Sequence, residues 1–496
     1  MNSCPDELVK EATNLLNFIE SVLTSIRKNS QASVLVNGFE VPVSNSFGVL
    51  DYQYPDKKVN AVRDLNRRLL ELINKFDGVY YVDLDLIRST IGQKAFFDIR
   101  HWHMSRLPYS RETLRILSME YFKFIRALKG KNKKCLILDC DNTLWGGIVG
   151  EDGLNHITIG KTYPGSAYKE FQEAILDLYH RGVMICLCSK NDQEAVLNVL
   201  DKHPDMVLKR DHFLKMKINW NDKSQNIREI AEELNIGLDS LVFIDDSEFE
   251  TNLIRQVLPM VTTITLPKDP TLYGELLRSS GLFDSLTYSA EDKARNAMYK
   301  AQEKREEEKQ NFTDIGEYLK YLEMEVDIHS ADDFSIPRIF QLAQKTNQFN
   351  LTTKRYSKSE LKTLSEGNNS GVFSLKLADR FGDNGIVGLM VLLYETGLCR
   401  IDSFLLSCRV IGREAEKLML HHILEECAKR NITRIIGTYI PTAKNSLVRE
   451  FYSQNKFKLL TLEEKEIEFV FDTELEKLEF ENVYKKIRIE GIEVEM

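Results

Sequence analysis

The sequence lacks the features that mark membrane-spanning, secreted or nucleic-acid-binding proteins. No apolar run reaches the ~20 residues that a transmembrane helix needs, so we expect no membrane contact. The N-terminus has no basic stretch followed by an apolar one, so no signal peptide is predicted. The formal net charge is −9 and no half of the chain is markedly basic. This charge argues against a general nucleic-acid binder, which needs clustered Lys and Arg.

Cysteine is scarce and scattered. The chain has eight Cys residues and no C-x-x-C pair. Cys186 and Cys188 lie two residues apart in a predicted strand, a spacing that suits neither a disulfide between them nor a zinc knuckle. Reduced thiols in a cytoplasmic protein are the simplest interpretation.

The length and composition indicate a soluble, multidomain protein. A chain of 496 residues is too long for one hydrophobic core, so about two to four domains are expected. The hydrophobic share of 43% and the charged share of 28% are ordinary for globular proteins.

The N-terminal quarter predicts a small α/β unit. Apolar residues with a helical period occupy residues 1–30, and residues 33–43 have the composition of a strand. A second helix at residues 59–76 and a second strand at 78–83 follow, and a further helix runs from 110 to 128. Strands that alternate with helices indicate an α/β arrangement.

An apolar run at residues 136–138 leads directly into Asp139-Cys140-Asp141-Asn142-Thr143. Side chains alternate along an extended chain, so Asp139 and Asp141 leave the predicted strand on one side. Two carboxylates this close repel each other unless a cation or a shared proton intervenes, and Mg²⁺ suits carboxylate ligands. One Asp then attacks phosphorus while the other handles protons. The alternative is an acidic turn after a core strand.

Two more predicted strands end in polar residues. Ser189 follows the predicted strand at residues 183–188, and Asp245 and Asp246 follow the predicted strand at residues 241–244. In an open parallel α/β sheet the carboxyl ends of the strands line one crevice, where ligands bind. The sequence therefore predicts a phosphate site in which these residues meet the first pair of aspartates.

These separated motifs resemble the haloacid dehalogenase (HAD) superfamily of phosphotransferases. The resemblance implies that Asp139 is the nucleophile, that Asp141 is the general acid and base, and that Lys223 screens the charge of the nucleophile. The residues expected to bind phosphate are Thr143, Ser189, Asn191 and Lys223, and those expected to hold Mg²⁺ are Asp139, Asp141 through its carbonyl, Asp245 and Asp246.

Longer motifs resemble the FkbH-like family more closely. They are Leu144–Gly153, Ser189–Asn191, Asn219–Lys223, Lys345–Asn350 and Ser407–Arg413. The resemblance implies a HAD domain followed by a domain similar to GNAT acyltransferases. It also implies an activity, which is to take the glyceryl group from 1,3-bisphosphoglycerate, dephosphorylate it and load it onto an acyl carrier protein for polyketide biosynthesis.

The C-terminal motif predicts an anion-binding loop. A strand, a turn at Gly412 and a helix from about residue 414 leave backbone N–H groups that point at an anion. The pattern resembles the pyrophosphate loop of GNAT proteins, although Arg413-Glu414 replaces the Gly or Ala common in relatives. We therefore expect a phosphopantetheine arm of a carrier protein as the ligand, bound by Arg409, Gly412, Arg413 and Asn445.

The acyl-transfer hypothesis needs a thiol. Cys140, between the two aspartates, is the first candidate, and Cys408 is the second. One alternative function is a plain Mg²⁺-dependent phosphatase that acts on a small phosphoester, with the C-terminal domain structural or partner-binding. Another is a carrier-binding acyltransferase with a degenerate HAD half.

The predicted fold class is α/β and multidomain, with a central HAD-type Rossmann-like parallel sheet and a C-terminal GNAT-like α+β domain. The charged run at residues 304–309 is expected to be a solvated face of the linker. The expected domains are an N-terminal α/β accessory domain at 1–128, a HAD-like domain at 129–285, a helical linker at 286–330, a GNAT-like domain at 331–470 and a tail at 471–496.

Overall fold

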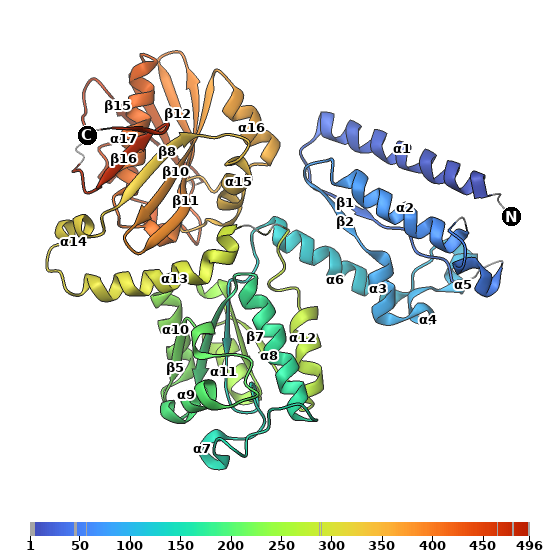
Figure 1. Ribbon diagram of the computed structural model, residues 1–496. Coiled ribbons are helices and arrows are strands. Elements are labelled where there is room, and N and C mark those ends of the chain that lie inside the picture. Colours follow the sequence, from blue (N-terminus) through green and yellow to red (C-terminus); the bar gives the residue numbers. More distant parts are fainter. Residues whose placement is uncertain are drawn as a thin grey trace. The chain divides into compact units, whose positions relative to one another are not determined.

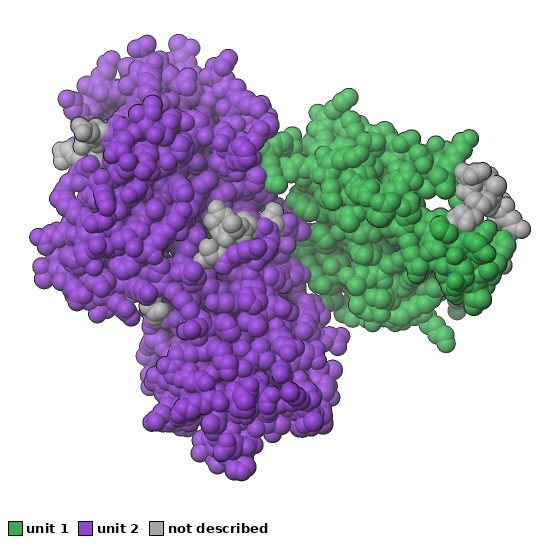
Figure 2. Space-filling model, in the orientation of Figure 1, with its two compact units in different colours: residues 1–126, 357–359 green, residues 127–356, 360–496 purple. Residues whose placement is uncertain are grey.

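The computed structural model resolves two compact units (Figure 2). The first contains residues 1–126 and 357–359, and the second contains residues 127–356 and 360–496. Among the described residues, no helix combines the length and the apolar character needed to cross a bilayer. The structure describes residues 5–43, 47–55, 57–286, 288, 290–463, 465–478 and 481–494.

The first unit is the α/β arrangement expected from the sequence. Two short parallel strands pair Val34 with Val79, and Leu16, Leu23 and Leu69 form the core between them and the helices. The elements are α1 (Pro5–Asn29), β1 (Val34–Asn37), α2 (Lys58–Ile73), β2 (Val79–Val82), α3 (Leu84–Ile91), α4 (Gln93–Phe96), α5 (Ile99–Ser105) and α6 (Arg111–Leu128).

The second unit begins with a five-stranded parallel sheet in the order β5-β4-β3-β6-β7. The predicted strands before Asp139, Ser189 and Asp245 are confirmed as its three central strands. The elements are β3 (Cys135–Leu138), α7 (Val149–Asp152), α8 (Gly165–His180), β4 (Met184–Ser189), α9 (Gln193–Lys202), β5 (Lys215–Ile218), α10 (Lys223–Glu233), β6 (Leu241–Asp245), α11 (Glu248–Val257), β7 (Thr262–Thr265) and α12 (Tyr273–Ser279).

Both faces of this sheet are buried, which explains the continuous apolar character of its central strands. Leu136 belongs to the core that contains Phe171 of α8, whereas Ile137 belongs to the core that contains Ile227 of α10. Alternate side chains of β3 therefore pack against helices on opposite faces. This packing holds the strand rigidly and fixes where its polar end emerges.

The chain then forms α13 and a ten-stranded mixed sheet (Figure 1). The multidomain α/β fold class is thus confirmed. The elements are α13 (Ala290–Lys309), α14 (Ile315–Tyr321), β8 (Glu325–Ser330), α15 (Ile336–Lys345), β9 (Phe349–Asn350), α16 (Lys358–Glu366), β10 (Ser370–Asp379), β11 (Gly382–Glu395), β12 (Leu398–Leu406), α17 (Ala415–Lys429), β13 (Arg434–Tyr439), α18 (Phe451–Gln454), β14 (Lys458–Leu462), β15 (Ile467–Asp472), β16 (Lys486–Ile489) and β17 (Ile492–Glu493).

Two features of the second unit differ from the sequence-based expectations. Arg305 lies in the charged run expected to be solvated, yet it is only 1% exposed because it pairs with the buried Asp379. Residues 486–489 lie in the expected tail, yet they form β16 and pair in parallel with β8. The linker helix and the C-terminal residues are therefore built into the domain that they adjoin.

Candidate active site

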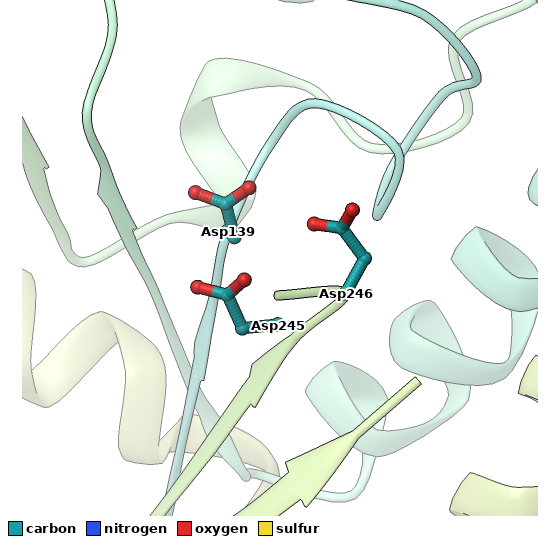
Figure 3. Close-up of side chains that lie close together, drawn as sticks. All are labelled: Asp139, Asp245 and Asp246. Carbon is teal, nitrogen blue, oxygen red and sulfur yellow. The ribbon is translucent and has the colours of Figure 1, made fainter. Parts of the chain in front are cut away.

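Three aspartates converge at the carboxyl end of the parallel sheet (Figure 3). The register that pairs Leu138 with Ile244 places Asp139 level with Asp245, and the Asp139 N–H donates to the Ile244 carbonyl at 3.0 Å. One carboxylate oxygen from each of Asp139, Asp245 and Asp246 lies within 4.8 Å of the others. The predicted meeting of these aspartates at the carboxyl edge of the sheet is therefore present.

Lys223 joins two of these carboxylates. Its Nζ donates to Asp139 Oδ1 at 2.7 Å and to Asp245 Oδ2 at 2.6 Å. Lys223 is the first residue of α10, whose N-cap Asp222 accepts a hydrogen bond from the Ser224 N–H. Burial opposes its charge, but Asp139 and Asp245 outweigh that effect and raise the Lys223 pKa. The lysine thus remains a cation beside Asp139.

The carboxylates of Asp245 and Asp246 are destabilised as anions even beside Lys223. Burial, followed by the charge of Asp139, raises the pKa of Asp245 to about 7. The same two causes raise the pKa of Asp246. One lysine therefore does not neutralise the cluster.

The donor set fits Mg²⁺, a hard cation that prefers a few carboxylate oxygens and retains several waters. Asp139, Asp245 and Asp246 are the residues that would hold it, and its charge would relieve their repulsion. The Asp141 carboxylate is not part of this group. The prediction that Asp141 contributes its backbone carbonyl stays a prediction.

The Asp141 carboxylate is instead fixed by three N–H donors. Trp145 Nε1 donates to Oδ1 at 2.9 Å, the Val149 backbone N donates to the same oxygen at 3.1 Å, and Asn191 Nδ2 donates to Oδ2 at 2.7 Å. Despite these bonds, burial raises the Asp141 pKa. Asn191, which was predicted to bind phosphate, orients Asp141 in this structure.

The loop after β3 is shaped by local hydrogen bonds. Asn142 adopts a positive φ of 53° and accepts the Gly147 N–H at 2.9 Å. Gly147 has a φ of +95°, and a Cβ there would lie 2.5 Å from Asp152 Oδ2. Tyr273 of α12 donates its hydroxyl to the Asn142 carbonyl at 3.1 Å. No sequence pattern pointed to Tyr273, which lies far along the chain from the loop.

The other predicted residues of this domain lie close to the aspartates but are largely enclosed. Ser189, at the end of β4, is 2% exposed, and Thr143 is fully buried, with no hydrogen-bond partner for its hydroxyl oxygen in the described part of the chain. Cys140 is 0% exposed and belongs to the apolar core beneath the sheet. Burial, with a smaller contribution from the Asp139 charge, raises its pKa well above the ordinary value. Its thiol is therefore neutral and shielded.

The predicted anion-binding loop precedes α17, but its side chains serve the fold. Arg413 pairs with the buried Asp379 at 2.8 Å and donates to Gln302 Oε1 at 2.6 Å. The fully buried Asn445 donates to the carbonyls of Asn350 and Ile440. Both side chains have partners within the chain, and their expected role in binding a pantetheine arm stays a prediction.

Arg409 and Gly412 complete the predicted loop. The Arg409 Nε donates to Ser407 Oγ at 3.2 Å, and its guanidinium also contacts the Met298 sulfur. Gly412 adopts a φ of +78°, which suits the turn expected before the helix. Their expected role in binding a pantetheine arm stays a prediction.

Cys408 lies at the opposite end of the parallel sheet from Asp139. Its carbonyl accepts from Asn235 Nδ2 at 3.3 Å, and its thiol hydrogen-bonds with Tyr299. The neighbouring cation Lys134 immediately precedes β3, whereas Asp139 immediately follows it. Among the cysteines of the described residues, Cys408 alone is not buried.

Comparisons with solved structures agree with the parallel-sheet domain. The N-terminal part of the protein BF1531 from Bacteroides fragilis, which contains a phosphatase domain complexed with Mg, is 33% identical, covers 58% of this chain and 76% of its own, and has a TM-score of 0.54. No protein-family model and no curated protein matches this chain.

Weaker likenesses cover about a third of this chain. The ribosomal-protein-S18-alanine N-acetyltransferase from Escherichia coli is 13% identical, over 32% of this chain and 99% of its own, with a TM-score of 0.24. The PaiA N-acetyltransferase from Thermoplasma acidophilum in complex with coenzyme A is 12% identical, over 30% of this chain and 98% of its own, with a TM-score of 0.23. Likenesses at this level carry no argument about activity.

Proposed function

Because this chain belongs to the same family of HAD-like, Mg²⁺-binding phosphatase-domain proteins as BF1531, we propose that it removes the phosphate from a glyceryl substrate and supplies the glyceryl group to a carrier protein. The observation that carries the phosphatase part is the bridge from Lys223 to Asp139 and Asp245 beside Asp246. The finer assignment to the FkbH-like family, with 1,3-bisphosphoglycerate as substrate, rests on the long sequence motifs.

Asp139 is placed to attack phosphorus. Its carboxylate oxygen forms the new P–O bond while the bond from phosphorus to the substrate oxygen breaks, which leaves a phosphoaspartate. Lys223 holds Asp139 by a hydrogen bond of 2.7 Å and partly neutralises its charge before the phosphate arrives. Bound Mg²⁺ supplies the further positive charge that offsets repulsion between carboxylates and phosphoryl oxygens.

Asp141 is placed to move the protons. Its raised pKa favours a protonated carboxyl, which donates its proton to the departing substrate oxygen. The resulting carboxylate then removes a proton from water, and the water oxygen attacks the phosphoaspartate and releases phosphate and Asp139. Trp145, the Val149 N–H and Asn191 hold the carboxyl in one orientation throughout.

The thioester step needs an accessible thiol, and the structure bears on which one acts. Cys140 is enclosed in the core and its thiol pKa is raised, so we do not propose Cys140 as the residue that is acylated. Cys408 lies beyond the amino end of β3, away from Asp139. We therefore assign the attacking thiol to the carrier protein itself. Its sulfur bonds to the acyl carbon, the bond to the acyl phosphate oxygen breaks, and the thiol proton passes to solvent.

A plain phosphatase acting on a small phosphoester is the second candidate. In this candidate, as in the first, the buried Cys140 only fills the space between the catalytic aspartates. The two candidates share every step at Asp139 and differ only in whether a carrier thiol is acylated.

The test is the mass of a holo carrier protein after incubation with 1,3-bisphosphoglycerate, Mg²⁺ and this protein. We expect a glyceryl adduct with the wild type and a phosphoglyceryl adduct with Asp139→Asn, because Asp139 acts only on the remaining phosphate. Cys140→Ala and Cys408→Ala serve as matched controls and should leave the glyceryl adduct in place. An unmodified carrier, with phosphate still released from small phosphoesters, would establish the plain phosphatase. A mapped adduct on Cys140 or Cys408 would restore an enzyme thioester.

A further inference from the structure

Helix α6 of the first unit has a second apolar face that lies outside the core of that unit. Leu114, Met119, Phe122 and Ile125 are 43%, 52%, 54% and 48% exposed. They recur at helical spacing and lie on one side of the helix. The opposite side of α6 is already used, since Thr113 and Leu117 are buried in the core of the unit. The exposed face is therefore additional to the packing that the fold needs.

Basic side chains accompany the apolar ones on this face. The helical spacing of Arg111, Arg115 and Arg126 places them on the same side of α6 as these apolar residues. The Arg126 guanidinium lies 5.0 Å from the centre of the Phe122 ring. Within α6, Glu112 pairs with Arg115 of this face and Glu120 pairs with Lys123, each at 2.7 Å, so Arg111 and Arg126 give the rim its net positive charge. The face is thus apolar with an arginine rim, in a chain whose net charge is −9.

This combination selects among possible occupants. A bilayer requires apolar side chains that reach well into the interface, whereas these are only about half exposed and the helix is anchored by its other side. An acidic protein surface with an apolar groove complements both the rim and the centre.

We propose that this outward face of α6 is a docking surface for an acidic, helical carrier protein, with Phe122 as the central anchor and Arg111, Arg115 and Arg126 as its charged rim. The identity of the partner rests on the proposed function, which requires a carrier protein as acceptor. The helix then acts as the rigid half of a helix-in-groove contact. Aromatic and arginine side chains are the types that contribute most to such contacts.

The experiment measures binding of a holo acyl carrier protein to the full-length protein by calorimetry at 50 and 200 mM salt. We expect Phe122→Asp and Arg111→Glu each to weaken binding at least tenfold, and the wild-type affinity to fall with salt. Phe18→Asp on α1, where Phe18 is 64% exposed, is the matched control and should bind as the wild type does. Arg111 is exposed at the first position of α6, where a glutamate favours the helix, so that variant should fold.

Other outcomes overturn the proposal. Unchanged binding in both variants, an equal loss in the Phe18 control, or no carrier binding by the wild type would each remove the docking surface. A wild-type dimer that Phe122→Asp converts to a monomer would assign the face to self-association, and sedimentation with phosphatidylserine vesicles alone would assign it to a membrane. Phosphate release from a small phosphoester should be the same in all these proteins. If the wild type bound the carrier protein but released no phosphate, the proposed function would be contradicted and the docking surface would stand.

Discussion

Lys223 Nζ lies 2.7 Å from Asp139 Oδ1 and 2.6 Å from Asp245 Oδ2, so a single ammonium group links the ends of two neighbouring strands. The three side chains are nearly inaccessible, with exposed fractions of 5%, 9% and 1%. The bridge therefore works in a poorly screened environment, where one charge has a large effect on its neighbours.

Replacing Lys223 by Met should remove the bridge and leave the two carboxylates facing each other. We expect kcat for phosphate release to fall by about 10²–10³-fold, the cost typical of losing one preorganised charge-stabilising donor. Steady-state kinetics on a small phosphoester measure this effect. Lys217→Met, which breaks a pair with Glu229 at a partly exposed site, is the control and should retain wild-type kcat. A Lys223→Met protein with wild-type kcat would show that the bridge is only structural.

Asn191→Ala should disturb the orientation and the titration of Asp141. The lost N–H donor at 2.7 Å favoured the ionised carboxylate, so the Asp141 pKa should rise further. The alkaline limb of the kcat/KM profile, where the protonated acid is lost, should move to higher pH, and kcat should fall roughly ten- to a hundredfold. The exposed Asn252 offers the control Asn252→Ala. An unshifted pH profile in Asn191→Ala would argue against Asp141 as the acid.

Asp379→Asn should destabilise the second unit strongly. The Asp379 side chain is 0% exposed and pairs with both Arg305 and Arg413, so its neutralisation leaves two buried cations uncompensated. We expect a loss of about 3–5 kcal/mol in the free energy of unfolding, measured by urea denaturation. Asp383→Asn breaks a pair with Lys376 whose side chains are about half exposed, and it should cost less than ~1 kcal/mol. An equal loss in the free energy of unfolding in the two variants would contradict the claim that burial makes the Asp379 ion pairs more important for stability.

His422 should make the protein less stable in acid. It is 1% exposed, its ring nitrogens have no hydrogen-bond partner among the described residues, and burial lowers its pKa to about 4. Below the unfolded value of 6.5 the unfolded chain binds a proton that the native state refuses, so stability falls as the pH drops from 6.5 towards 4. His422→Leu should remove this dependence and add about 1 kcal/mol of stability.

Urea midpoints at pH 5 and pH 7.5 measure the effect of His422. The neighbouring His421, whose side chain is 31% exposed, supplies the control His421→Leu. An unchanged pH dependence in His422→Leu would place the acid sensitivity elsewhere.

The central strands and their polar ends were predictable from the sequence, whereas the edges of the sheet were not. Strands buried on both faces produce continuous apolar runs, and polar residues directly after such runs stand out. The edge strands β5 and β7 have only four residues each and are partly exposed, so they lack that signal. The same argument explains the missed β16, which lies near a sheet edge.

Side-chain partnerships were the least predictable part of the site. The sequence placed Asn191 near the phosphate, but only the fold shows that its amide reaches Asp141. From the sequence, Arg305 is expected to be solvated and Arg413 to bind an anion. The buried Asp379 side chain that pairs with both is distant from them in sequence. Such contacts depend on how elements pack, and a local pattern does not encode that.

The most direct test of the account is the rate of phosphate release by wild-type and Asp139→Asn proteins, each with Mg²⁺ and with excess chelator. The account predicts release only by the wild type with Mg²⁺, and a loss of at least about 10³-fold in Asp139→Asn, because an amide in place of the Asp139 carboxylate does not form the phosphoaspartate. Release by Asp139→Asn at a rate near that of the wild type, or release by the wild type in chelator, would contradict it.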